Sequence, residues 1–230
     1  MRRFFSSTLP TCSHSVLLER EISHHLLRVV GIAPNEEIEL FDGQGQGCIA
    51  ILVGVQEGLA EVFWVQTLSE SIERPSLTLV LALTKGDAFS TAIRMATEMG
   101  VSRIVPLQAQ RSIPKGDKQA RWQKIATGAA AQSKRLSIPT VDGLQTWTTL
   151  WNMLPSDDVR WVLHPAAIDV LPVSSITQST TIFIGPEGGF TAQEIEWMLE
   201  SGGEYRSLGS LVLKADTAAI VACARALGTV

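Results

Sequence analysis

The pattern of hydrophobic and polar positions changes at residue 77, and the change divides the chain into two parts. In the first part, hydrophobic and polar residues alternate at 37–41, and two further short runs rich in hydrophobic residues follow at 48–53 and 60–66. Alternation predicts β-strands with one buried face, and the glycine-rich sequences between the runs, such as Asp42-Gly-Gln-Gly, are typical of hairpin turns. The first part is therefore predicted to be a small β-barrel or sandwich.

The second part follows a polar, proline-containing stretch at 69–76, which is the predicted linker. Its first apolar run, at 77–83, is continuous, as in a strand that is buried on both faces. Further strands are predicted at 103–107, 161–163 and 181–184, and helices at 87–99, 117–132, 147–153, 191–201 and 218–227. Strands that alternate with helices predict an α/β fold with a mainly parallel sheet. The predicted domains are 1–72 and 73–230.

A glycine-rich loop follows the predicted strand at 181–184. The sequence Gly185-Pro-Glu-Gly-Gly-Phe lets the backbone approach a ligand closely. Thr191 and Glu194 then form a capping-box sequence at the start of a helix. Because ligands bind at the carboxyl ends of strands in open α/β sheets, this loop is a candidate binding site. An ordinary strand-to-helix turn would explain the same residues.

A second loop of this kind covers 208–217 and leads into the last predicted helix. Asp216 or Thr217 is predicted to cap that helix. A charged pair beside a buried helix start is costly unless it is satisfied or useful, so Lys214 and Asp216 are candidate functional residues. The alternative is a capped helix whose lysine extends into solvent.

Charge is distributed unevenly along the chain. Residues 85–135 carry ten Lys and Arg against three acidic residues, a local charge of +7, which leaves −11 on the rest of a chain of net charge −4. A basic face attracts nucleic-acid phosphates, although a solvated helix surface would have the same composition. The pair Lys134-Arg135, after the basic helix, is either a phosphate clamp or a favourable end to the helix dipole.

Composition disfavours several classes of function. The three cysteines and four histidines follow no metal-ligand spacing, so we expect no metal. No apolar run reaches the roughly 18 residues of a membrane-spanning helix. The N-terminus lacks an apolar stretch of signal-peptide length, so we expect a cytoplasmic protein. The chain has no P-loop, dinucleotide-binding fingerprint or nucleophile elbow.

Short motifs spread over essentially the whole chain carry a family resemblance. In the first part they are Met1-Arg-Arg-Phe-Phe, His24-His-Leu-Leu-Arg-Val and Leu40-Phe-Asp-Gly. In the second part they are Leu83-Thr-Lys-Gly-Asp, Ala96-Thr-Glu-Met-Gly-Val, Arg111-Ser, Gln132-Ser-Lys-Arg, Ile184-Gly-Pro-Glu-Gly-Gly-Phe-Thr and Leu208-Gly. Together they resemble the ribosomal RNA small subunit methyltransferase E family.

The resemblance implies an S-adenosylmethionine-dependent enzyme that methylates N3 of a uridine in 16S rRNA of the small ribosomal subunit. It also implies a PUA-like β-barrel that binds RNA, a SPOUT-type domain with a trefoil knot, and a homodimer. The implied cofactor-binding residues are Leu163, His164, Pro165, Ile184, Gly185, Pro186, Glu187, Gly188, Gly189, Leu208, Gly209 and Leu213. The implied RNA contacts are Arg2, Arg3, His24, His25, Arg28, Lys85, Arg111 and Lys134.

The implied reaction suggests catalytic roles for a few charged residues. Uridine N3 must lose its proton before it can attack a methyl group, and a nearby cation would stabilise the resulting anion. Arg135 and Lys214 are our candidates for that cation. Asp216 or Glu187 is our candidate for the proton acceptor.

The chain departs from the family pattern at four positions. Ala131 and Asp216 stand where the family has glutamate, and Leu211 and Lys214 stand where it has arginine. A lysine cannot reproduce a bidentate arginine contact, so the orientation of the target base is in question. One alternative is therefore a catalytically impaired RNA-binding or ribosome-assembly factor. Another is an unrelated α/β enzyme that uses the same loops on a phosphorylated small molecule.

Overall fold

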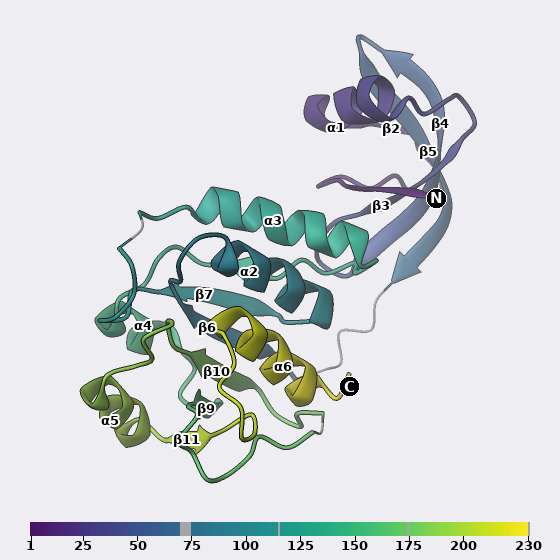
Figure 1. The fold of residues 1–230 in the computed structure, drawn as a ribbon. Coiled ribbons are helices and arrows are strands. Elements are labelled where there is room, and N and C mark those ends of the chain that lie inside the picture. Colours follow the sequence, from purple (N-terminus) through teal and green to yellow (C-terminus); the bar gives the residue numbers. More distant parts are fainter. Residues whose placement is uncertain (70–74, 115, 174, 230) are drawn as a thin grey trace. The chain divides into compact units, whose positions relative to one another are not determined.

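The computed structural model describes residues 1–69, 75–114, 116–173 and 175–229, which form two units (Figure 1). The first unit comprises Met1–Glu73 and Ala130–Ile138, and the second comprises Arg74–Ala129 and Pro139–Val230. The predicted domain boundary after residue 72 lies outside the described residues. The predicted ranges did not separate residues 130–138 from the second domain.

The first unit is built on a five-stranded sheet in the order β1-β3-β4-β5-β2. The strands are β1 (Arg2–Phe5), β2 (Val16–Leu17), β3 (Glu37–Phe41), β4 (Gln46–Gln56) and β5 (Leu59–Ser69). β1 pairs with β3 in parallel, and the other neighbours are antiparallel. The three runs that the sequence predicts as strands lie in β3, β4 and β5.

This sheet is open, whereas the sequence pattern predicts a small barrel or sandwich and the family resemblance implies a PUA-like barrel. No strand pairing in the described part of the chain joins the edge strands β1 and β2, and β2 offers only two residues of backbone. Hydrophobic side chains of the sheet, among them Ile38 and Leu52, pack instead with Leu26 of a helical segment. That segment consists of α1 (Arg20–His24) and a π-helical turn, η1 (His25–Val30).

The segment at 130–138 packs against the sheet of the first unit, and the two share a small hydrophobic cluster. Ala130 and Leu136 are buried against Phe41, the last residue of β3. The hairpin after β3 contacts the segment directly, because Gly45 N–H donates to the Leu136 carbonyl over 3.2 Å. Gly43 has a φ of 74°, which favours glycine, and a side chain there would meet Ile138 Cδ1 at 2.7 Å and displace it.

The second unit contains a six-stranded parallel sheet in the order β11-β9-β10-β6-β7-β8. The strands are β6 (Leu77–Ala82), β7 (Arg103–Leu107), β8 (Thr140–Val141), β9 (Val159–Leu163), β10 (Thr180–Ile184) and β11 (Gly203–Arg206). Every residue of the neighbouring strands β6 and β10 is buried, as their continuous apolar runs predict. The predicted parallel α/β sheet is confirmed.

Helices cover both faces of this sheet (Figure 1). They are α2 (Ala88–Met99), α3 (Gln119–Gln132), α4 (Trp147–Met153), α5 (Ala192–Glu200) and α6 (Ala215–Leu227). α2 and α6 pack against each other, whereas Leu150 of α4 and Met198 of α5 share a core with Phe183 of β10. Among the described residues, no helix is both long and apolar enough to cross a membrane.

The start of α6 differs from the prediction. Lys214 is the N-cap residue, and it makes no side-chain capping bond. Asp216 or Thr217 was predicted to cap this helix, but both residues already lie within its first turn. Asp216 is nevertheless well placed there, because a carboxylate in the first turn interacts favourably with the helix dipole.

Candidate functional site

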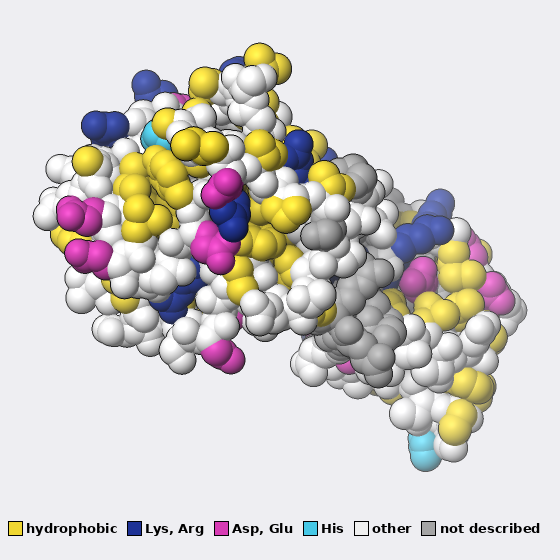
Figure 2. All heavy atoms as spheres, turned by 90° about the horizontal axis from the view of Figure 1, so that it is seen from below, with side chains coloured by type: hydrophobic (Ala, Val, Ile, Leu, Met, Phe, Trp, Pro, Cys, Tyr) yellow, Lys and Arg dark blue, Asp and Glu magenta, His cyan; other side chains and the backbone are white. Residues whose placement is uncertain are grey.

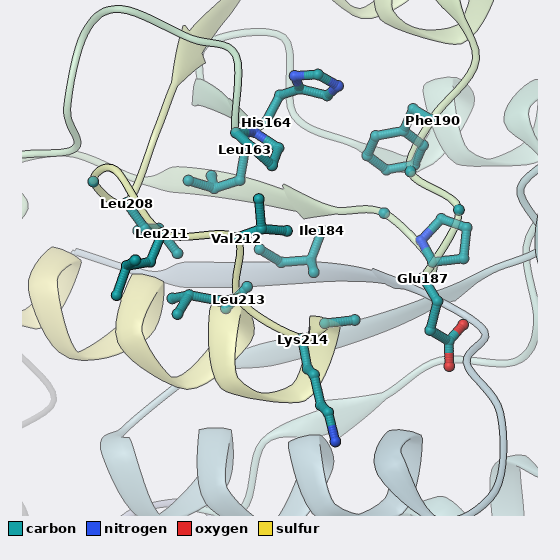
Figure 3. A pocket seen from close by; sticks show the side chains of 18 residues that line it. Leu163, His164, Ile184, Glu187, Phe190, Leu208, Leu211, Val212, Leu213 and Lys214 are labelled. Atoms are coloured by element: carbon teal, nitrogen blue, oxygen red, sulfur yellow. The ribbon is translucent and has the colours of Figure 1, made fainter.

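A pocket of about 460 Å³ lies at the carboxyl edge of the parallel sheet, where the chain leaves β9, β10 and β11 (Figure 3). It is lined by Leu163, His164, Pro165, Ile184, Gly185, Pro186, Glu187, Gly188, Gly189, Phe190, Leu208, Gly209, Leu211, Val212, Leu213, Lys214, Ala215 and Ala218. All twelve cofactor-binding residues implied by the resemblance are among them. The structure therefore brings together three segments that are far apart in the sequence.

Glycines shape the pocket because the backbone there needs space or unusual torsion angles. Gly189 has a φ of 68° and Gly209 a φ of 123°, in the region that only glycine adopts readily. A side chain at Gly185 would lie 3.2 Å from Phe190 N, so the loop at 185–190 is tightly folded. Backbone N–H and C=O groups are thus accessible along the pocket, as recognition of a polar ligand requires.

Hydrophobic side chains supply much of the remaining lining. Ile184 and Leu163 are buried beneath the pocket, whereas Leu211 and Val212 are 76% and 79% exposed at its edge. Ile168, in the chain between β9 and β10, is 95% exposed. Figure 2 shows hydrophobic side chains gathered on one face of the molecule. Exposed apolar surface of this kind marks a binding site for a ligand or a protein partner.

His164 is the titratable residue of the pocket whose protonation the structure perturbs. Its Nδ1 accepts a hydrogen bond from Ala166 N–H over 3.1 Å, so the neutral ring carries its proton on Nε2. The ring also stacks on Tyr205, with centroids 5.3 Å apart. Burial lowers the pKa of His164 from its ordinary value of 6.5, so the imidazole is neutral at neutral pH.

Two charged candidates of the second unit, Lys214 and Glu187, line the pocket, and Asp216 is not part of its lining. Lys214 is exposed, and its side chain extends toward the same side of the pocket as that of Glu187 (Figure 3). Glu187 Oε1 accepts a hydrogen bond from Lys85 N–H over 2.7 Å, which joins the loops after β6 and β10. Asp216 lies in the first turn of α6, where its carboxylate accepts from Thr217 N–H.

Arg135 and Lys134 belong to the first unit and not to the unit that contains the pocket. The Arg135 guanidinium donates to Ser137 Oγ over 3.2 Å. Lys134 is exposed and has a φ of 61°, in the left-handed conformation that often ends a helix. The structure therefore brings Lys214, Asp216 and Glu187 together in one unit and assigns Arg135 to the other.

Sequence reasoning anticipated only part of the hydrogen bonding of Glu194, which is 2% exposed. Its carboxylate accepts from Thr191 N–H and Oγ–H, as the capping box predicts, but also from Gln110 N–H and Trp147 Nε1–H. Burial alone would raise its pKa, but these four hydrogen bonds outweigh burial and hold the pKa below 4.5. Only the capping-box part of this arrangement leaves a signal in the sequence.

The implied RNA contacts of the first unit fall into two groups. Arg3 is a packing residue: its side chain is 6% exposed, pairs with Glu39 at 3.2 Å and lies over the Phe41 ring. His25 packs edge-on against Phe4. By contrast, His24 and Arg28 line a surface groove together with Arg20.

Two of the remaining implied RNA contacts donate hydrogen bonds to main-chain carbonyls of the protein itself. Arg2 Nη1 donates to the Val30 carbonyl over 3.0 Å, within the first unit. Arg111 Nη1 donates to the Gly188 carbonyl over 2.8 Å, so it contacts the glycine-rich loop after β10. In the described part of the chain, no group of three or more His, Cys, Asp or Glu side chains could hold a metal ion.

Comparison with known proteins identifies the family. A model described as an RNA methyltransferase domain matches residues 72–227. The ribosomal RNA small subunit methyltransferase E of Synechocystis is 33% identical, over 88% of this chain and 69% of its own length. The protein of that name from Bacillus subtilis is 29% identical, over 86% of this chain and 84% of its own.

Solved structures agree with the sequence comparison. The ribosomal RNA small subunit methyltransferase E of Neisseria gonorrhoeae, bound to S-adenosyl methionine, has a TM-score of 0.87 and 28% identity, covering 97% of this chain and 95% of that one. A methyltransferase of Legionella pneumophila, in complex with the same cofactor, has a TM-score of 0.85 and 27% identity, covering 96% and 95%. The chain belongs to the ribosomal RNA small subunit methyltransferase E family.

Proposed function

We propose that the protein uses S-adenosylmethionine to methylate N3 of a uridine in 16S rRNA of the small ribosomal subunit. The observation that carries the proposal is the pocket at the carboxyl edge of the parallel sheet, whose lining includes every cofactor-binding residue implied by the family motifs. Open α/β sheets bind ligands at this edge. Two relatives with the same fold were solved with this cofactor bound.

The residues of the pocket are suited to S-adenosylmethionine. Its volume of about 460 Å³ is in the range of small-ligand sites. Gly185 and Gly209 leave backbone groups open to the polar edges of a nucleoside, while Ile184 and Leu213 offer apolar contact to its rings. When bound, the cofactor supplies a methyl group that its sulfonium has already activated. The protein must then position the uridine base and accept the proton that leaves N3.

Lys214 and Asp216 are the proposed catalytic residues of this unit. The Lys214 ammonium at the rim stabilises the negative charge that develops when uridine N3 loses its proton. Asp216 or Glu187 accepts that proton; each carboxylate already accepts one main-chain N–H, from Thr217 and Lys85 respectively, and each keeps a second oxygen for the base. Arg135 is proposed as a second cation on the family resemblance alone.

We propose that the first unit binds RNA through the groove lined by Arg20, His24 and Arg28. Guanidinium groups bind phosphates whatever the base sequence. A base-paired uridine must in addition be unpaired or flipped out before its N3 can react. Lys85 and Lys134 are further proposed contacts, because both side chains are exposed.

Four finer features are proposed together with the activity. They are the PUA-like character of the first unit, a trefoil knot in the second, a homodimer and a cytoplasmic location. The exposed apolar side chains of Ile168, Leu211 and Val212 support the homodimer, since a partner subunit would cover such surface. The knot and the PUA-like character rest on the family resemblance.

Methyl transfer from labelled S-adenosylmethionine to small ribosomal subunits that lack the modification tests the activity. Nucleoside mass analysis of the product should find labelled N3-methyluridine. The competing function is that of a catalytically impaired RNA-binding or ribosome-assembly factor. It is favoured by the four departures from the family pattern, at Ala131, Leu211, Lys214 and Asp216. Cofactor binding without transfer to any rRNA would support that factor and contradict the proposed reaction.

The groove of the first unit gives a separate prediction. Arg28→Gln should weaken binding to 16S rRNA fragments about threefold to tenfold at low salt, with unchanged stability, because it removes one exposed phosphate contact. Arg3→Gln should instead lower the free energy of unfolding by about 2 kcal/mol, because it breaks a buried ion pair. Filter binding and denaturant unfolding of both variants measure the two effects. Weaker RNA binding by Arg3→Gln together with unchanged RNA binding by Arg28→Gln would contradict the proposal that Arg28 contacts RNA and Arg3 does not.

A further inference from the structure

The loop at 185–190 is connected to its surroundings on three sides. Lys85 N–H, in the loop after β6, donates to Glu187. Arg111, in the loop after β7, donates to the Gly188 carbonyl. Beyond the loop, the Glu194 carboxylate binds the main chain of Thr191 and Gln110. These connections link the carboxyl ends of β6, β7 and β10.

Glu194 has the strongest of these connections. Its Oε1 accepts from Gln110 N–H at 2.8 Å and Trp147 Nε1–H at 2.7 Å, and its Oε2 accepts from Thr191 N–H at 2.7 Å and Thr191 Oγ–H at 3.0 Å. Hydrogen bonds to a buried carboxylate are among the strongest in proteins. A capping box needs only the Thr191 pair, so the bonds from Gln110 and Trp147 go beyond helix capping.

The position of Trp147 extends this effect to the pocket. Its ring packs edge-on against Phe190, with centroids 5.7 Å apart, and Phe190 is a buried residue of the pocket lining. Phe190 N also lies against Gly185, where no side chain could be accommodated without displacement. Glu194 therefore holds both Thr191, the residue that follows the loop, and Trp147, whose ring packs against Phe190.

We propose that Glu194 is a positioning residue, whose buried carboxylate holds the loop at 185–190 in the shape that binds S-adenosylmethionine. It contacts neither the cofactor nor the RNA, and acts through Thr191, Trp147 and Phe190. The proposal rests on the proposed cofactor and adds a residue outside the pocket to it. A preorganised loop avoids the entropy cost of ordering on binding, so loss of the carboxylate weakens affinity more than it slows the reaction.

Glu194→Gln tests the proposal, because an amide keeps the shape but presents an NH₂ group to donors that need an acceptor. We expect the Kd and KM for S-adenosylmethionine to rise about tenfold, with kcat at saturating cofactor within about twofold of wild type. Calorimetry gives the Kd without any RNA substrate. Glu196→Gln is the matched control, since Glu196 is exposed on the same helix, and it should behave as wild type.

Two outcomes would overturn the proposal. A lower melting temperature with an unchanged Kd would make Glu194 a helix cap only, and a fall in kcat with an unchanged KM would place it in the chemistry. Trp147→Phe removes one donor and keeps the ring packing, so it decides the case if Glu194→Gln does not fold, with a Kd about threefold higher expected. A wild-type protein that binds no S-adenosylmethionine would overturn the proposed function itself, and this inference with it.

Discussion

Lys214→Met should lower kcat for methyl transfer about 100-fold and leave the Kd for S-adenosylmethionine within about threefold of wild type. The residue lies at the rim of the pocket and precedes α6 with an extended backbone, which methionine can adopt equally well. The substitution therefore removes a positive charge without altering the loop. A cation that acts only on the anion of the target base affects kcat and kcat/KM alike.

Lys214→Arg is the matched variant for this experiment. Arginine keeps the charge, and the family pattern has arginine at this position, so the rate should stay within about threefold of wild type or rise. Single-turnover methylation of unmodified small subunits, with cofactor binding measured in parallel, separates the two parameters. Full activity of Lys214→Met would exclude Lys214 from catalysis and move the role of the cation to another residue.

Gly209→Val should weaken binding of S-adenosylmethionine about 100-fold, because valine is strained at the φ of 123° that the loop requires. Nothing lies within 4 Å of the position of an added Cβ, so the effect comes from the backbone and not from a steric clash. The loop would change its torsion angles, and the segment at 208–214 would no longer line the pocket as it does now.

A second glycine controls for strain as such. Gly202 has a φ of 82° at the end of α5, also with open space around it, and it is not part of the pocket lining. Gly202→Val should therefore destabilise the protein by a similar amount and leave cofactor affinity unchanged. Calorimetric titration of both variants compares them directly, and equal losses of affinity would mean that general stability sets binding.

Much of the second unit could be predicted because its elements follow from local patterns. The continuous apolar runs of β6 and β10 and the capping box of Thr191 depend on neighbouring residues, and the structure confirms them. The pocket lining was anticipated from family motifs, whereas the hydrophobic pattern alone indicated only two glycine-rich loops at strand ends. The residues at 184–189 and 208–213 meet in space because of the strand order, which no local pattern specifies.

The predictions that differed from the structure depended on long-range contacts. Arg3 is a charged residue and was expected at the surface, where it could contact RNA. In the structure its side chain is surrounded by Glu39, Phe41 and the Arg135 carbonyl. The sequence around Glu194 predicts only a helix cap. The structure adds hydrogen bonds from Gln110 and Trp147, which lie outside that helix. The small barrel or sandwich was inferred from several short strands with glycine-rich turns, and this local pattern does not determine whether the edges of a sheet meet.

The discontinuity of the first unit affects how the protein is made. A nascent chain that has emerged only as far as β5 contains every strand of this unit but lacks Leu136, which covers Phe41, and the Arg135 carbonyl, which binds Arg3. The unit therefore cannot complete its core during synthesis until residue 138 has left the ribosomal exit tunnel. Translation must pass through β6, α2, β7 and α3 before the N-terminal sheet is finished, so the two units mature together rather than in sequence.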